Sequence, residues 1–205
     1  MISRDERLRV VGIGGTLREG STCLGALRRA LEGAREAGAE TRLLDLRTLD
    51  LPMYEPGLSL ADYGPQVERF IEEVREADAL ILSTAAYHGT LAGVTKNALD
   101  FTQFLDRDEW PYLEGRVVGL ISTSGGERAA ANTTDALVHV VHALRGVVAP
   151  SMVTIPRARR HSDGEGNITD ESYGARLERL GRLVVQMAGG LSSGVRGAEA
   201  LGAAV

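Results

Sequence analysis

One stretch decides how the rest of the chain is arranged: Val10-Val11-Gly12-Ile13-Gly14-Gly15-Thr16-Leu17-Arg18-Glu19-Gly20-Ser21-Thr22. An apolar run ends at paired glycines, a short polar loop follows, and a helical pattern begins at Ser21. A strand, a tight loop and a helix N-terminus in this order present backbone N–H groups to an anion. Thr16, Ser21 and Thr22 add hydroxyl donors, and Arg18 adds a planar charged group that suits a phosphate.

Two well-known phosphate loops do not fit this stretch. The dinucleotide fingerprint G-x-G-x-x-G fails, because Leu17 stands where its third glycine is required. The triphosphate loop G-x-x-x-x-G-K-[ST] nearly fits from Gly15 to Ser21, but it lacks the lysine that contacts the outer phosphates. Two interpretations remain: a loop suited to one terminal phosphate, as on FMN, and an ordinary glycine-rich turn between a strand and a helix.

Composition excludes several other classes of protein. A chain of 205 residues is most simply one domain with a real core, and its net charge of −5 argues against a nucleic-acid-binding protein. Cys23 is the only cysteine, so no intramolecular disulfide forms, and no Cys/His cluster has the spacing of a metal site. No signal peptide, lipidation motif or long apolar run is present. We therefore expect a cytoplasmic protein that does not bind membranes.

Strand and helix patterns alternate five times along the chain, which predicts a parallel sheet with helices on both faces. With the phosphate loop after the first strand, the five strands suit the order 2-1-3-4-5, and a ligand would lie at the carboxyl ends of strands 1 and 3. The predicted strands are 8–13, 41–46, 79–84, 116–122 and 147–155, and the predicted helices are 21–38, 65–77, 93–105, 132–145 and 172–188. We expect one domain over residues 1–188 and a mobile, small-residue tail over 189–205.

Three loops would converge at one edge of this sheet, namely 14–22, 84–93 and 122–128. Sequence motifs in these loops resemble those of a known family. Gly15–Ser21 looks like the G-S-x-R-x-x-S motif of the NAD(P)H-dependent FMN reductase family, which has a flavodoxin-like, three-layer α/β fold. Thr84–Asp100 is similar to that family's T-P-x-Y-x-G-x-x-x-G-x-x-K-N-A-L-D and holds the only lysine, Lys96. Ser124-Gly125-Gly126 resembles the third flavin loop, so the resemblance spans roughly Leu8 to Ile155.

The resemblance implies a bound FMN and the residues that hold it. Its phosphate would contact Thr16, Arg18, Ser21 and Thr22, with Cys23 where the family often has asparagine. Its ring would lie against the following residues: Ala85, Ala86, Tyr87, His88, Gly89, Ser124, Gly125 and Gly126. His88 stands where the family often has asparagine, and it either donates a proton to the substrate or stabilises its loop. Lys96 and Asp100 are four residues apart on a helix and predict an ion pair.

The resemblance also implies a function. NADH or NADPH would reduce the bound FMN, which would pass electrons to a free flavin, a quinone or an azo compound. Two alternatives stay open: an FMN-dependent dehydrogenase of a small anionic metabolite, similar to those acting on aminodeoxychorismate, and a flavodoxin-like electron carrier. The basic run Arg157, Arg159, Arg160 and His161 would receive an anionic substrate or the phosphates of NADPH, or it is a solvated loop.

The predicted helix over residues 132–145 has apolar residues over more than half of its circumference, among them Val138, Val140, Val141 and Leu144. Contact with one sheet cannot bury all of them. The sequence therefore predicts a homodimer or a homotetramer.

Overall fold

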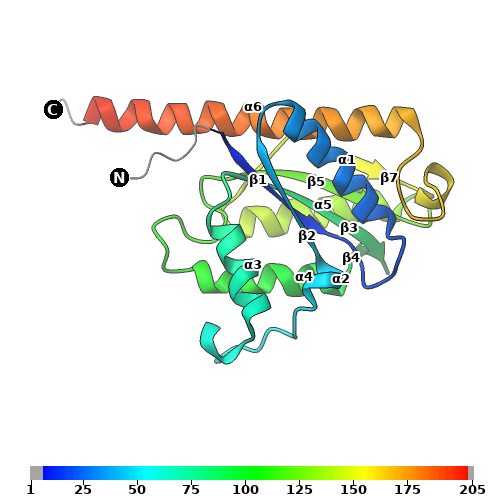
Figure 1. Ribbon diagram of the computed structural model, residues 1–205, viewed down its shortest axis with the longest axis horizontal. Coiled ribbons are helices and arrows are strands. Elements are labelled where there is room, and N and C mark those ends of the chain that lie inside the picture. Colours follow the sequence, from blue (N-terminus) through cyan, green and yellow to red (C-terminus); the bar gives the residue numbers. More distant parts are fainter. Residues whose placement is uncertain (1–6, 203–205) are drawn as a thin grey trace.

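The computed structural model describes residues 7–202, which form three layers with a sheet between two layers of helices (Figure 1). The strands are β1 (Arg9–Gly14), β2 (Glu40–Asp45), β3 (Ala79–Tyr87), β4 (Thr90–Leu91), β5 (Val117–Thr123), β6 (Val147–Val148) and β7 (Val153–Ile155). The α-helices are α1 (Thr22–Glu36), α2 (Leu46–Leu49), α3 (Pro65–Arg75), α4 (Gly93–Asp100), α5 (Ala129–Ala143) and α6 (Glu171–Gly202). Short 3-10 helices are η1 (Leu60–Asp62), η2 (Phe101–Leu105) and η3 (Ala158–His161).

The central strands are apolar on both faces, because helices cover both. In β3, Leu80 and Leu82 pack with residues of α3, α4 and α5, whereas Ala79 and Ile81 pack with residues of α1 and α6. This alternation is the two-residue period of a strand. All seven residues of β5 are buried. Two apolar cores therefore lie on the two sides of one sheet, as the alternating sequence pattern predicts.

The predicted sheet of five parallel strands needs two corrections. The sheet has seven strands in the path β2-β1-β3-β5-β6, with β4 paired to β3 and β7 paired to β5. The strand predicted over residues 147–155 is interrupted, since β6 pairs with Val117 and Val118 and β7 pairs with residues 121–123. Pro150 has no N–H to give to the ladder, and Ser151 has a φ of 70°, so the chain leaves the sheet between β6 and β7.

The second correction concerns the segment after β3. The strand predicted to end at Thr84 continues to Tyr87 and turns back as β4, with Tyr87 opposite Thr90 in an antiparallel pair. His88 and Gly89 form the two-residue turn and have φ values of 50° and 88°, the left-handed conformations that such hairpins require. The Thr84 hydroxyl accepts a hydrogen bond of 3.1 Å from the N–H of Ala92 and so holds the end of the hairpin.

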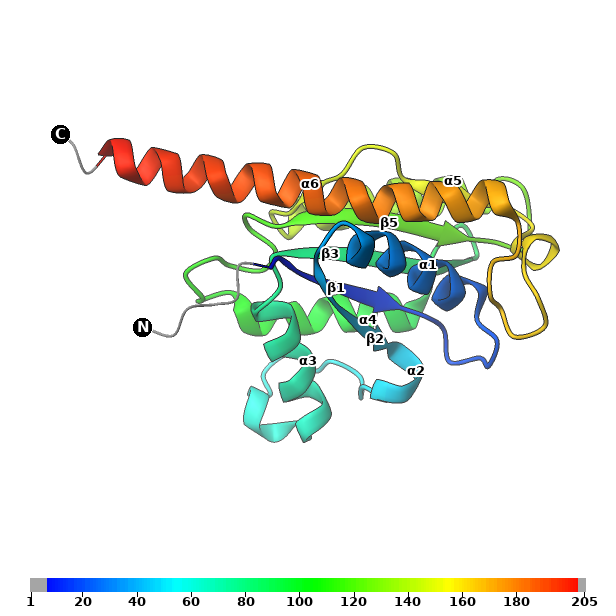
Figure 2. The same ribbon diagram turned by 45° about the horizontal axis from the view of Figure 1, so that its top comes forward.

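Helices α1 and α6 cover the same face of the sheet (Figure 2), and their backbones pack closely against each other. A Cβ added to Gly181 would lie 1.9 Å from the carbonyl oxygen of Ala30, and one added to Gly33 would lie 2.1 Å from that of Glu178. An ion pair of 2.8 Å between Arg29 and Glu178 borders this contact. The two backbones therefore touch only because glycine occupies both positions.

Helix α6 is longer than the sequence predicts. The predicted helix ends at Ala188, but α6 continues to Gly202, and its last turns extend past the sheet (Figures 1 and 2). The glycines after Ala188 lower helix propensity, but no proline removes a backbone donor, so nothing in this segment forces the helix to end. Residues 203–205 of the predicted tail lie outside the described residues. Within residues 7–202, no helix has both the length and the apolar composition that a membrane span requires.

Candidate cofactor site

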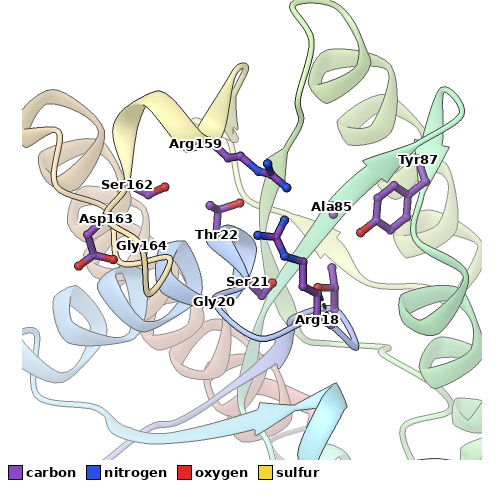
Figure 3. Close-up of a pocket in the computed structure, with 11 residues that line it drawn as sticks. Arg18, Gly20, Ser21, Thr22, Ala85, Tyr87, Arg159, Ser162, Asp163 and Gly164 are labelled. Atoms are coloured by element: carbon purple, nitrogen blue, oxygen red, sulfur yellow. Dashed lines mark hydrogen bonds between the residues drawn. The ribbon is translucent and has the colours of Figure 1, made fainter.

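A cavity of about 330 Å³ lies at the carboxyl ends of β1 and β3 (Figure 3). Three segments line it: the loop after β1, the end of β3, and the chain from η3 onward. The lining residues are Thr16, Arg18, Gly20, Ser21, Thr22, Ala85, Tyr87, Arg159, Ser162, Asp163 and Gly164. β1 and β3 are parallel neighbours, so the loops that follow them start at the same edge. This is the edge at which doubly wound sheets bind ligands.

The loop after β1 depends on its two glycines. A Cβ on Gly14 would lie 2.4 Å from the carbonyl oxygen of Ser83, so only glycine allows β1 to approach β3 this closely. Gly15 has a φ of 102°, which a residue with a side chain rarely adopts. The Ser83 hydroxyl donates a hydrogen bond of 2.7 Å to the carbonyl oxygen of Cys23 and so ties the first turn of α1 to β3.

The N-terminus of α1 carries an uncompensated partial positive charge. Ser21 is the N-cap residue, but its side chain makes no capping hydrogen bond, and the first turn contains no acidic residue. The Ser21 hydroxyl lies 3.1 Å from the Cys23 sulfur, and Thr22 Oγ1 donates to Thr123 Oγ1 at 3.4 Å. The end of the helix dipole that faces the cavity therefore favours an anion.

Two arginines face this cavity from opposite sides. Figure 3 shows the guanidinium groups of Arg18 and Arg159 directed into the same space beside Thr22. Within residues 7–191, neither guanidinium forms an ion pair, since Glu19 pairs with Arg47 at 2.6 Å and Glu127 pairs with Arg157 at 2.7 Å. The cavity thus offers two guanidinium groups that form no ion pair with a carboxylate of these residues.

The one carboxylate that borders the cavity is already engaged by its own loop. Asp163 accepts hydrogen bonds of 2.9 Å from the backbone N–H groups of Glu165 and Asn167. The Asn167 side chain donates to it as well and lowers the pKa of this carboxyl group. Asp163 therefore serves to fold the loop, and the polar groups left over in the cavity are hydroxyls and arginines, which suit a phosphate.

Six of the residues predicted to bind the cofactor line this cavity: Thr16, Arg18, Ser21, Thr22, Ala85 and Tyr87. Cys23, Ala86, His88, Gly89, Ser124, Gly125 and Gly126 are not among the lining residues, and their contact with a cofactor stays a prediction. Cys23 is fully buried, and burial raises the pKa of its thiol. The Ser124 hydroxyl donates to the carbonyl oxygen of Gly126 at 2.6 Å and so shapes the loop after β5.

The structure adds Gly20, Arg159, Ser162, Asp163 and Gly164 to the site. Of these, Gly20 belongs to the phosphate loop quoted from the sequence and Arg159 to the basic run 157–161, whereas no sequence pattern indicated Ser162, Asp163 or Gly164. The structure divides that run: Arg157 pairs with Glu127, His161 lies 2.8 Å from Asp170, and Arg160 is exposed outside the cavity.

The motif Thr84–Asp100, which resembles the family's second flavin loop, also has structural roles. Lys96 and Asp100 form the predicted ion pair across one turn of α4. Asn97 accepts a hydrogen bond of 2.9 Å from the N–H of Tyr54 and donates one of 2.8 Å to the carbonyl oxygen of Pro52. Asn97 thereby holds the loop between α2 and η1 against α4.

Comparisons with known proteins agree with this geometry. The family model described as NADPH-dependent FMN reductase matches residues 8–160. An NAD(P)H-dependent FMN reductase of Pseudomonas aeruginosa is 32% identical over 80% of this chain and 86% of its own length. An NADPH:quinone oxidoreductase of Arabidopsis thaliana is 25% identical over 84% of this chain and 88% of its own length.

The fold is shared with solved flavoproteins. The structure of an NAD(P)H:(acceptor) oxidoreductase flavoenzyme from Paracoccus denitrificans superposes with a TM-score of 0.68 and 24% identity, covering 88% of this chain and 97% of that one. The α/β layers are therefore those of a flavodoxin-like fold, with a largely parallel sheet. Together with the matched residues 8–160, this places the chain in the NADPH-dependent FMN reductase family.

Proposed function

We propose that this protein is an FMN-dependent oxidoreductase whose cavity beside α1 binds the FMN phosphate. The observation that carries the proposal is the pair of unneutralised arginines above the N-terminus of α1, among the hydroxyls of Thr16, Ser21 and Thr22. A phosphate matches this set of donors in charge and in hydrogen-bonding capacity. Membership in the family supports NADH or NADPH as the electron donor.

The chain's own residues bind and orient the cofactor. When bound, FMN supplies hydride acceptance and donation at its N5 atom. The loop after β1 would hold the phosphate, and the end of β3 would hold the ring, because Ala85 and Tyr87 face the same cavity. The Tyr87 side chain is half exposed and points toward the cavity in Figure 3, so it would form one wall of the ring site. The loop over residues 124–126 would form another.

Anaerobic reduction tests this function. The protein reconstituted with FMN should lose its visible flavin absorbance when NADPH or NADH is added without any other substrate. A quinone, a free flavin or an azo compound should then restore the absorbance. Bleaching by an anionic metabolite but by neither nicotinamide would instead identify the dehydrogenase alternative, and bleaching only by a reduced partner protein would identify the electron carrier.

Replacing His88 tests whether its imidazole transfers a proton during the reaction. We expect His88→Asn to leave kcat and its pH dependence unchanged, because the described structure shows His88 only as a turn residue with a φ of 50°. Asparagine adopts this conformation readily, so the hairpin should keep its shape. Steady-state rates over a range of pH measure the effect. A large fall in kcat with an unaltered melting temperature would show that the imidazole moves a proton.

We also propose that the protein is a cytoplasmic homodimer or homotetramer. Val141 of α5 is fully buried, but Val138, Val140 and Leu144 are only partly buried at the edge of the same core. Met53 and Trp110 add large apolar surfaces with exposed fractions of 72% and 44%. Association would remove these surfaces from water. Light scattering at micromolar concentration should give at least twice the mass of one chain, and the mass of a single chain would contradict the proposal.

A further inference from the structure

The structure assigns to Arg159 the role of a second phosphate-binding arginine, which closes the cavity from the side opposite Arg18. This inference rests on the proposed function and extends it to a residue outside the phosphate loop. Arg18 and Arg159 would hold the dianionic phosphate monoester of FMN between them, and Arg159 would thereby help to select FMN over riboflavin, which has no phosphate.

The backbone around Arg159 is fixed before any ligand binds. Ala158 is buried, and its N–H donates a hydrogen bond of 2.9 Å to the carbonyl oxygen of Ser124. The Ser162 hydroxyl donates to the carbonyl oxygen of Ala158 at 3.1 Å, which closes the turn of η3. Arg157, just before η3, is anchored to Glu127. Arg159 therefore lies in a short helix that is held at both ends. Ligand binding would have to order little further backbone there, which lowers its entropic cost.

The positive charges of Arg159 and Arg18 favour the binding of an anion between them. Its guanidinium and that of Arg18 are directed into the same space (Figure 3), where two cations repel one another. No ion pair of the described residues 7–191 involves either group, and Asp163 is held by its own loop. A phosphate between the two guanidinium groups would convert this repulsion into two sets of charge-assisted hydrogen bonds.

The loop after η3 closes this end of the cavity. Residues 162–168, here called the strap, fold back on themselves through a bridge between Ser162 and Ile168. The strap lies directly on α1 and the loop before it: a Cβ on Gly25 would be 2.0 Å from the carbonyl oxygen of Gly166, and one on Gly166 would be 2.6 Å from that of Gly20. This end of the cavity therefore suits a ligand that ends in a phosphate better than a ligand that continues beyond its phosphate.

Titration of the apoprotein with FMN and with riboflavin tests the role of Arg159. We expect Arg159→Ala to weaken FMN binding by about tenfold or more, as expected for losing a hydrogen bond to a charged group, and to leave riboflavin binding unchanged. Arg159→Lys should recover part of the loss, because it keeps the charge but not the planar fork. Arg160→Ala is the matched control: Arg160 is the next residue, is exposed and does not line the cavity.

The outcomes separate this inference from the proposed function. Equal affinity of the wild type for FMN and riboflavin would overturn the phosphate site, and Arg159 with it. A wild type that prefers FMN, and loses that preference in Arg18→Ala but keeps it in Arg159→Ala, would overturn the role of Arg159 alone. If Arg159→Ala raised the KM for NADPH but not for NADH and left FMN affinity unchanged, the role of Arg159 at the FMN phosphate would likewise be overturned. Arg159 would then bind the additional phosphate of NADPH.

Discussion

Gly181→Ala is expected to destabilise the fold by about 3 kcal/mol, at the upper end of the range for overpacked sites. The new methyl group would lie 1.9 Å from the carbonyl oxygen of Ala30, and a backbone atom cannot rotate away as a side chain can. Helices α1 and α6 would have to separate, which would also loosen the contact of Gly33 with Glu178. Thermal unfolding should show a melting temperature lower by about 10 °C for a domain of this size.

Gly190→Ala on the same helix is the matched control. Gly190 is exposed, and nothing lies within 4 Å of a Cβ built on it. Alanine in a helix interior is favoured over glycine by about 1 kcal/mol, so this variant should be as stable as the wild type or slightly more stable. Equal melting temperatures for the two variants would mean that the α1–α6 crossing tolerates a side chain, contrary to the packing described above.

The order of the central elements could be predicted because each one carries its own signal. Strands buried on both faces are continuous apolar runs, as in Ala79–Leu82, and the amphipathic helices over 22–36 and 65–75 repeat their apolar residues at helical spacing. The end of β3 was less predictable. Residues 85–91 give no alternating pattern of apolar and polar residues, so the sequence does not predict the left-handed turn at His88 and Gly89 or the hairpin, whose end is held by the hydrogen bond between Ala92 and Thr84.

The site was predictable only where its residues are close in sequence. The loop 16–22 has its glycines, hydroxyls and arginine in one short stretch, and all of its polar lining residues were identified from that stretch. Arg159 and the strap are more than 130 residues from the loop 16–22 along the chain, and the strap packs directly on α1 at Gly25 and on the preceding loop at Gly20. No local pattern encodes that contact, so the basic run 157–161 could be seen in the sequence but not placed.

Arg18→Ala is expected to weaken FMN binding by about 1.5–3 kcal/mol, the range for hydrogen bonds to charged groups, or roughly 10- to 150-fold in Kd. The physical reason is the cavity's charge: Arg18 is one of two guanidinium groups that face it, and neither forms an ion pair with a carboxylate of residues 7–191. Riboflavin lacks the phosphate, so its affinity should not change. Titrating the apoprotein with both flavins, at low and at high salt, measures the difference.

Salt makes this test more specific. Added salt weakens interactions between partly exposed charges, so wild-type affinity for FMN should fall as ionic strength rises, and Arg18→Ala should show a shallower dependence. Arg28→Ala is the control for a general loss of positive charge, because Arg28 lies on the exposed side of the same helix α1 and does not line the cavity. If Arg18→Ala and Arg28→Ala reduced FMN affinity equally, the effect would come from the protein's overall charge, and the phosphate would have to be held elsewhere.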